Sequence, residues 1–135
     1  MIVIDTSAVV AIAFAEPERD AFVRAIDQAD QALISTVSVV EARLVVHGRR
    51  GQRAVVLLDD LLRLPVFEKV PPSVAETDAA YAAFVAYGKG SGHPAGLNFG
   101  DLFGYALAKV RGLPLLFKGN DFSETDIDQA WSPPA

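Results

Sequence analysis

The chain has 135 residues, of which 51% are hydrophobic and 21% are charged, a composition typical of a globular protein and not of a disordered one. It contains no cysteine, which excludes a disulfide framework and any cysteine-ligated zinc site. The formal net charge of −5 argues against a protein that coats nucleic acid without specificity, although residues 43–118 hold ten basic and six acidic residues.

The sequence carries no sign of a targeting or membrane segment. The first basic residue is Arg19, so no positively charged segment of the kind that opens a secretory signal precedes the apolar start of the chain. The longest uncharged apolar run, residues 8–15, is eight residues long, whereas a membrane-spanning helix needs about 20. We therefore expect one cytoplasmic domain that spans residues 1–135.

Short apolar strands alternate with helical segments along the chain. Strands are expected at residues 1–5, 32–35, 66–70 and 113–117. Helices are expected over residues 8–15, 17–29, 38–48, 51–64, 73–88 and 100–112. Two of these helices start with capping boxes, Ser38–Glu41 and Ser73–Glu76. The alternation predicts an α/β fold whose short parallel sheet has helices on both faces and whose sites lie beyond the carboxyl ends of the strands.

Two helices have apolar residues whose placement can be predicted. On the helix over residues 73–88, Val74, Tyr81, Val85 and Gly88 are expected to form the buried stripe. The helix over residues 51–64 has an excess of apolar side chains, which suggests a surface for a second copy or a partner. A locally thick core would explain that excess equally well. The residues concerned are Val55, Val56, Leu57, Leu58, Leu61 and Leu62.

Four acidic residues fall at expected strand ends or helix starts: Asp5, Glu41, Asp101 and Asp121. Each also has an ordinary structural explanation, respectively a helix N-cap, the last residue of a capping box, an acid favoured by the helix dipole, and an Asx turn. If they gather at one edge of the sheet, they form a site of oxygen ligands that suits Mg²⁺ or Mn²⁺.

The sequence offers few other groups for catalysis. His47 and His93 lack the spacing of a metal-binding pair, and neither has an evident serine and aspartate partner. There is no phosphate-binding loop and no dinucleotide fingerprint after the first strand. A metal-bound water is therefore the expected nucleophile, and hydrolysis of a phosphodiester is the expected reaction, because metal ions can offset charge on the transferring phosphoryl group.

Four sequence segments, taken together, resemble the motifs of a PIN domain. They are residues 2–8 (IVIDTSA), 38–41 (SVVE), 96–101 (GLNFGD) and 119–122 (GNDF). Over its whole length the chain resembles a VapC-type toxin ribonuclease of a type II toxin–antitoxin system. The resemblance implies a PIN-like three-layer α/β/α fold and an endoribonuclease that depends on Mg²⁺ or Mn²⁺. It also implies a homodimer, an RNA substrate and inhibition by a VapB-like antitoxin protein.

The resemblance implies roles for individual residues. Asp5 and Asp101 resemble the principal metal ligands of the family, and Glu41 completes the acidic triad. Thr6 and Ser7 resemble residues that position the nucleophilic water or a phosphate through hydroxyl and backbone donors. No residue selects one RNA among many, although the resemblance favours a structured RNA loop such as one in tRNA.

The fourth acidic position departs from the common pattern of the family. Many relatives carry Thr-x-Asp just after the last strand, where this chain has Phe-Lys-Gly at residues 117–119. The Gly-Asn-Asp-Phe segment at residues 119–122 resembles a subgroup of the family whose last acid precedes Phe, which makes Asp121 the candidate for the fourth acid. Asn120 is an alternative that would hold a metal-bound water. This departure affects the expectation of a second metal ion but not that of the first.

Two other functions start from the same residues. A phosphatase with Asp5 as covalent nucleophile also begins with an apolar strand that ends in Asp, but its general acid would be an Asp at the position of Ser7. A PIN-like interaction module with a decayed site is the second alternative, against which the intact acids argue. The basic residues expected near the site as RNA contacts, or else as ordinary solvated charges, are Arg43, Arg49, Arg50, Lys89 and Lys118.

Overall fold

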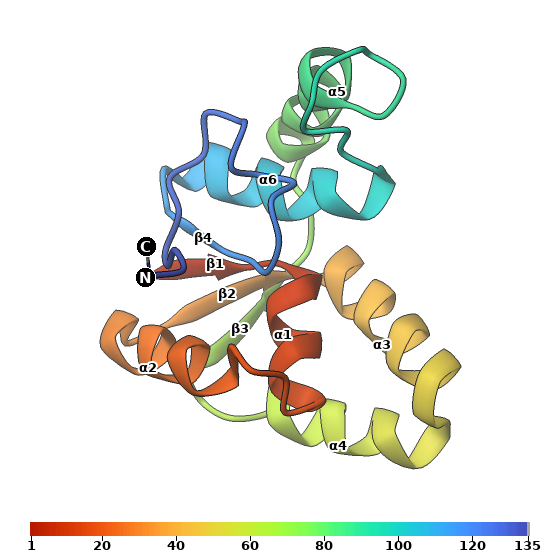
Figure 1. Ribbon diagram of the computed structural model, residues 1–135, viewed down its shortest axis with the longest axis vertical. Coiled ribbons are helices and arrows are strands. Elements are labelled where there is room, and N and C mark those ends of the chain that lie inside the picture. The colour runs from red at the N-terminus through yellow and green to blue at the C-terminus, as the bar shows by residue number, and fades with distance from the viewer. Residues whose placement is uncertain (135) are drawn as a thin grey trace.

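The computed structural model describes residues 1–134 and is built around a four-stranded parallel sheet (Figure 1). Its strands are β1 (Ile2–Ile4), β2 (Ala32–Ser35), β3 (Phe67–Val70) and β4 (Leu115–Leu116). They lie in the order β3-β2-β1-β4, and all neighbours pair in parallel. The predicted α/β class is therefore confirmed, although β4 is shorter than the expected strand over residues 113–117.

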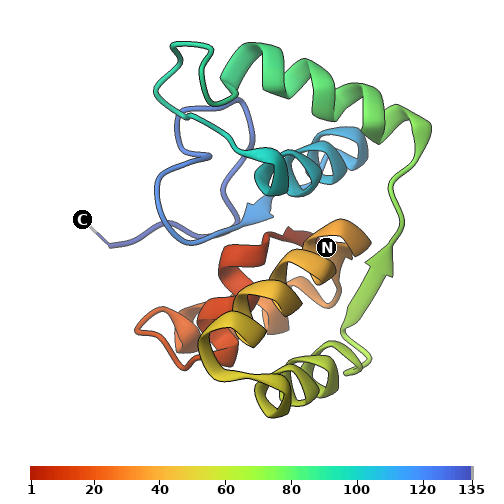
Figure 2. The ribbon, with the colours of Figure 1, turned by 90° about the vertical axis from the view of Figure 1, so that its right-hand side faces the viewer.

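Helices cover both faces of this sheet. They are α1 (Thr6–Ala13), α2 (Arg19–Ala29), α3 (Thr36–Arg50), α4 (Gln52–Leu62), α5 (Val74–Tyr87) and α6 (Phe99–Arg111). The first four lie on one side of the sheet, and α5 and α6 lie on the other (Figures 1 and 2). The three-layer α/β/α arrangement is thus confirmed. No helix within residues 1–134 combines the length and apolar character needed to cross a bilayer.

The strands are apolar throughout because both of their faces are covered. Successive side chains alternate between the two layers, so Ile2 and Ile4 pack in the core with α1–α4 while Val3 packs in the core with α5 and α6. Leu115 and Leu116 divide between the same two cores. This alternation fixes the register of β1 and with it the position of the residue that follows the strand.

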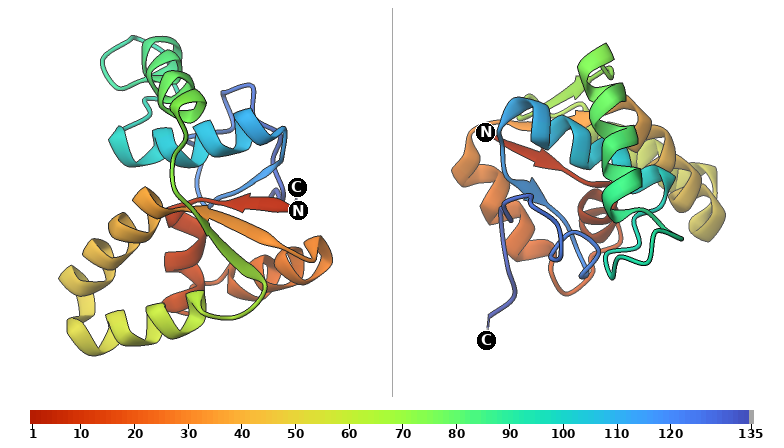
Figure 3. Two further views of the ribbon diagram at one scale, coloured as in Figure 1. Left: turned by 180° about the vertical axis from the view of Figure 1, so that it is seen from behind. Right: turned by 90° about the horizontal axis from the view of Figure 1, so that it is seen from above.

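The sheet changes its winding direction at β1, and this determines where a site can form. From β1 the chain adds β2 and then β3 on one side, whereas β4 returns to the other side of β1. Seen from behind, the segment after β3 rises past the sheet to α5, which lies beside α6 (Figure 3). Such a reversal leaves a crevice beyond the carboxyl ends of the two strands between which the order reverses, here β1 and the edge strand β4. Asp5 is the first residue after β1.

The start of α3 differs from the predicted one. The helix begins at Thr36, and its N-cap Ser35 lies three residues before the expected cap Ser38. Glu41 therefore takes no part in a capping box, and that structural explanation for it is wrong. The second predicted box, Ser73–Glu76, is confirmed. Because no capping contact uses Glu41, its carboxylate is available to the neighbouring helix.

The predicted buried stripe of α5 is wrong at three of its four residues, and only Gly88, the C-cap of the helix, is buried. Val74, Tyr81 and Val85 are 81%, 69% and 60% exposed. The helix rests on α6 through small side chains instead, among them Ala80 and Ala83, which are buried. Small residues allow two helices to approach closely, and the large apolar residues of α5 consequently remain on its outer surface.

The apolar excess of α4 divides between the core and the surface. Val55, Leu58 and Leu62 are buried in the core with α1–α3, so for these three the thick core is the correct explanation. Val56 and Leu57 are 49% and 69% exposed. The helix is thus an amphipathic cover for the sheet and offers only a narrow apolar strip to a partner.

Candidate active site

Asp5 lies at the switch point of the sheet and serves as the N-cap of α1. It is 2% exposed, and its Oδ2 accepts hydrogen bonds from the backbone N–H of Ser7 at 3.0 Å and from the Ser7 hydroxyl at 2.7 Å. Its Oδ1 is buried with no hydrogen-bond partner in the described part of the chain. The capping role therefore uses one oxygen of Asp5 and leaves the other free.

Burial raises the pKa of Asp5 to about 7, although the hydrogen bonds from Ser7 oppose the rise. The neighbouring carboxylates of Asp101 and Glu41 raise this pKa further, which shows that the three acids lie within electrostatic reach of one another. A positive charge beside Oδ1 would stabilise the ionised form of Asp5, because it would offset both burial and repulsion.

The two hydroxyl residues after Asp5 hold the surrounding elements together. Ser7 Oγ accepts a hydrogen bond from the backbone N–H of Lys118 at 3.0 Å, which links the start of α1 to the end of β4. Thr6 Oγ1 donates to the backbone oxygen of Ser38 at 3.3 Å and so joins α1 to α3. Both hydroxyl groups already donate to protein oxygens, so their first effect is to orient Asp5 and its helix.

Asp101 lies in the first turn of α6, where it forms a reciprocal capping box with Asn98. Asn98 Oδ1 accepts from the Asp101 backbone N–H at 3.2 Å, and Asp101 Oδ2 accepts from the Asn98 backbone N–H at 3.0 Å. Burial raises the pKa of Asp101 to about 6, the bond from Asn98 lowers it, and the charges of Asp121 and Glu41 raise it. The helix start thus fixes this carboxylate beside the other acids.

Two glycines of α6 allow the acids to converge. The Glu41 carboxylate of α3 contacts Gly100 so closely that a Cβ there would collide with it. One turn later, a Cβ on Gly104 would lie 3.1 Å from Asp5 Oδ1. Sequence reasoning missed both as site residues. The sequence signal that could have revealed them is the pair of glycines four residues apart in an expected helix, where each lowers the stability of the helix by about 1 kcal/mol relative to Ala.

Three of the four predicted acids, Asp5, Glu41 and Asp101, line one pocket of about 330 Å³. Asp121 is exposed and lies outside this lining, but its charge acts on Asp101. Asn120 is exposed in the same turn. Within residues 1–134, no three acidic or histidine side chains already enclose a metal position.

Charged residues from two other segments form the wall of the pocket. Lys118 Nζ pairs with Glu16 at 3.0 Å and with Glu18 at 3.3 Å, and Lys118, Glu16 and Arg49 all contribute to the lining. Sequence reasoning missed Glu16, since only the packing of the loop after α1 against the segment after β4 brings it to the pocket. It also missed Glu18, which does not line the pocket but pairs with Lys118.

The PIN domain family matches residues 2–128. The chain belongs to the PIN-domain family. Ribonuclease VapC30 of Mycobacterium tuberculosis is 46% identical to it over 125 residues, which are 93% of this chain and 95% of the relative. The resemblance that the four sequence segments indicated is thus confirmed.

Two solved structures share the fold of this PIN domain at low sequence identity. Mycobacterium tuberculosis VapC20, described as a toxin that cleaves the sarcin–ricin loop, has a TM-score of 0.75 and 18% identity, with 94% of this chain and 96% of that chain covered. A toxin–antitoxin complex from Klebsiella pneumoniae has a TM-score of 0.69 and 16% identity, with 98% and 100% covered.

The donors of this PIN domain fit a hard divalent cation. The free Oδ1 of Asp5 is a buried oxygen without a partner, and it faces the side of α6 that the two glycines leave open. Asp101 uses only Oδ2 in its capping box, which leaves Oδ1 as a second oxygen donor. Carboxylate oxygens are the ligands that Mg²⁺ and Mn²⁺ prefer.

Proposed function

We propose that the protein is an Mg²⁺- or Mn²⁺-dependent endoribonuclease that acts as the toxin of a toxin–antitoxin pair. The observation that carries this proposal is the buried Oδ1 of Asp5, which has no partner and lies within reach of the charges of Asp101 and Glu41 in a PIN domain. The 46% identity to a VapC ribonuclease supports RNA as the substrate.

We assign Asp5 and Asp101 as the metal ligands and Glu41 as the third acid of the site. A bound Mg²⁺ or Mn²⁺ would activate water and offset charge on the phosphoryl group. Glu41 reaches the pocket from α3 across Gly100, a position from which it orients the attacking water. Asp121 is the proposed fourth acid, because its charge acts on Asp101 from the turn after β4.

The neighbouring residues hold this arrangement in place. Ser7 donates to Asp5 Oδ2 and so keeps Oδ1 directed toward the pocket. Thr6, through its bond to Ser38 of α3, fixes the start of α1, where the helix dipole favours a phosphate oxygen. Asn120 is proposed to contact water or phosphate at the open edge, where it is exposed.

Purified protein should cut a circular RNA when Mn²⁺ or Mg²⁺ is present, because a circular substrate has no end for an exonuclease to enter. Excess EDTA should abolish the cleavage, and added metal should restore it. Cleavage that persists in excess EDTA would contradict the metal mechanism. Hydrolysis of a phosphomonoester without RNA cleavage would support the aspartate-nucleophile phosphatase instead.

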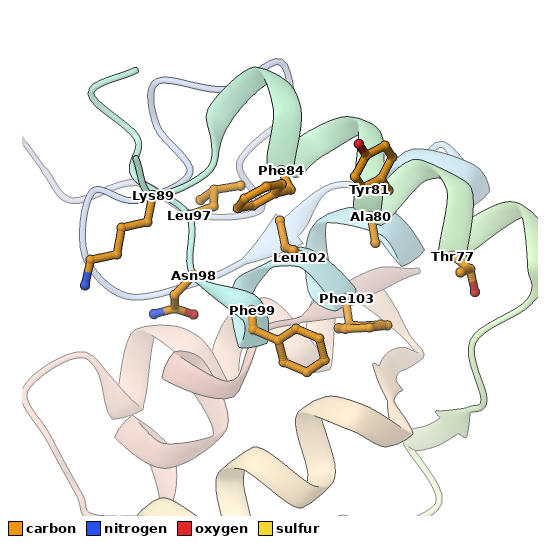
Figure 4. Close-up of a pocket in the computed structure, with 10 residues that line it drawn as sticks. All are labelled: Thr77, Ala80, Tyr81, Phe84, Lys89, Leu97, Asn98, Phe99, Leu102 and Phe103. Atoms are coloured by element: carbon orange, nitrogen blue, oxygen red, sulfur yellow. The ribbon is translucent and has the colours of Figure 1, made fainter. Parts of the chain in front are cut away.

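We further propose that the protein forms a homodimer through the surface shared by α3, α5 and α6. A groove of about 460 Å³ between α5 and α6 is lined by aromatic residues that include Tyr81, Phe84 and Phe99 (Figure 4). Phe99 is 71% exposed and also lines an apolar pocket with Val40 and Leu44 of α3. Monomeric proteins rarely expose so continuous an apolar surface.

Light scattering should report a dimer at micromolar concentration for the wild type and a monomer for Leu44→Arg, which places a charge in this surface. Leu64→Arg is the matched control, since Leu64 is 50% exposed beyond α4, and it should remain a dimer. A monomeric wild type, or a Leu44→Arg variant that stays dimeric, would contradict the proposed interface.

The proposed partner of the dimer is a VapB-like antitoxin protein. The acidic pocket attracts cations, so a basic side chain of the antitoxin can take the place of the metal charge beside Asp5 and Asp101. The toxin–antitoxin complex with the same fold supports this proposal.

A further inference from the structure

The basic residues that the sequence analysis predicted as RNA contacts fall into two groups according to their surroundings in the folded protein. Arg43 is paired with Asp59 at 2.9 Å, and Lys118 is paired with two glutamates. Lys89 lines the groove between α5 and α6 (Figure 4) and is not part of the lining of the acidic pocket. The two arginines at the carboxyl end of α3 have a different environment.

Arg49 and Arg50 both pack against the ring of Phe14. Their guanidinium carbons lie 5.4 Å and 4.4 Å from the centre of this ring, within the range of a cation–π interaction. Within residues 1–134, no ion pair involves Arg49, Arg50 or the nearby Arg53. The ring therefore holds two positive charges in place without neutralising them.

These charges are continuous with the acidic pocket. Arg49 lines that pocket together with Asp5. Phe14, Arg50 and Arg53 line the adjoining pocket of about 390 Å³. Phe14 caps the carboxyl end of α1, and Asp5 caps its amino end, so the length of the helix, about 12 Å, separates Asp5 from the ring that holds the two arginines. An RNA strand bound at the carboxylates of the pocket would therefore also contact fixed cations, within about the length of α1.

We propose that Phe14 is a positioning residue for RNA, whose ring orders Arg49 and Arg50 so that they bind phosphates flanking the scissile bond. This inference rests on the proposed ribonuclease function. RNA needs such a contact here, because the protein has a net charge of −5 and its pocket gathers carboxylates that repel phosphate. Arginine guanidinium groups recognise phosphate in a fixed geometry, and an ordered side chain loses less freedom on binding.

The test measures binding of a fluorescein-labelled single-stranded oligoribonucleotide of mixed sequence over a range of salt concentrations. Every protein carries Asp101→Asn so that the probe is not cut. Arg50→Ala should weaken binding and lower the salt slope by about 0.7, the value for one phosphate contact on a single strand. Arg111→Ala, which removes an exposed charge at the far end of α6, should leave the slope unchanged.

The variants of Phe14 separate positioning from simple packing. Phe14→Leu keeps an apolar side chain but removes the π face, and it should weaken binding by about fivefold. Phe14→Tyr keeps the π face of the ring and should bind the probe with the affinity of the parent protein, which carries only Asp101→Asn. In proteins with Asp101 intact, Phe14→Leu should raise KM and leave kcat unchanged, and melting temperatures report whether each variant is folded.

The inference is overturned if Arg50→Ala and Phe14→Leu bind the probe with the affinity and slope of Arg111→Ala. It is also overturned if they keep RNA affinity but lose binding of a co-expressed antitoxin, because the surface then belongs to the antitoxin. Failure of the wild type to cleave RNA with Mn²⁺ or Mg²⁺ would instead refute the proposed function, which the binding assay does not measure.

Discussion

Asp101→Asn should lower the rate of RNA cleavage by about a thousandfold, the size of effect seen when a group that stabilises transition-state charge is lost. The variant removes a negative charge from the proposed metal site. An Asn side chain still offers an oxygen to the Asn98 backbone N–H, so the capping box and the start of α6 are retained. The loss of activity should therefore not come from unfolding.

Single-turnover cleavage at saturating Mn²⁺ measures this effect. Asp27→Asn, which changes an exposed acid of α2, is the matched control and should cleave at the wild-type rate. If Asp101→Asn retained a tenth or more of the wild-type rate, Asp101 would not be a metal ligand.

The free energy of unfolding of the metal-free protein should fall as the pH rises from about 4 to about 7, with Asp5 as the main cause. The pKa of Asp5 is about 7 in the folded protein, against an ordinary value of 3.8. Between these values the folded state binds more protons than the unfolded chain, so stability decreases with rising pH. For a shift of this size the decrease is about 4 kcal/mol in all.

Urea denaturation in EDTA across this pH range measures the decrease. Asp101, whose pKa is about 6, contributes only to the lower part of the range. Asp5→Asn should therefore abolish the decrease between about pH 6 and pH 7, whereas Asp27→Asn should keep it. A wild type whose stability is constant or rises over this interval would show that Asp5 is not held in its protonated form.

Much of the fold follows from local sequence patterns. Uninterrupted apolar strands such as Ile2–Ile4 are typical of a sheet covered on both faces, and the alternation with helices predicts parallel pairing. The capping box at Ser73–Glu76 follows from adjacent residues alone. These features depend on neighbours in the chain, so the sequence is sufficient to predict them.

The convergence of the acids depends on contacts between segments that are distant in the chain, and local sequence patterns do not predict such contacts. Glu41 has the spacing of a capping box, and only the earlier start of α3 at Thr36 frees it for the pocket. Its contact with Gly100 joins residues that are far apart in the chain. The outward position of Tyr81 has the same origin, because the packing of α5 on α6 favours its small residues.

The melting temperature of the wild type and of Asp101→Asn, each in EDTA and in Mn²⁺, tests most directly whether the carboxylates form one metal site. Burial and the repulsion between carboxylates raise the pKa values of both Asp5 and Asp101. Removing the charge of Asp101 therefore removes an unfavourable electrostatic free energy from the metal-free folded protein. Asp101→Asn should therefore melt roughly 5 °C above the wild type in EDTA at neutral pH. Mn²⁺ at a hundredfold excess over its dissociation constant should stabilise the wild type by about 2.7 kcal/mol, and the variant by less. A variant that melts below the wild type in EDTA, with neither protein responding to Mn²⁺, would contradict the account.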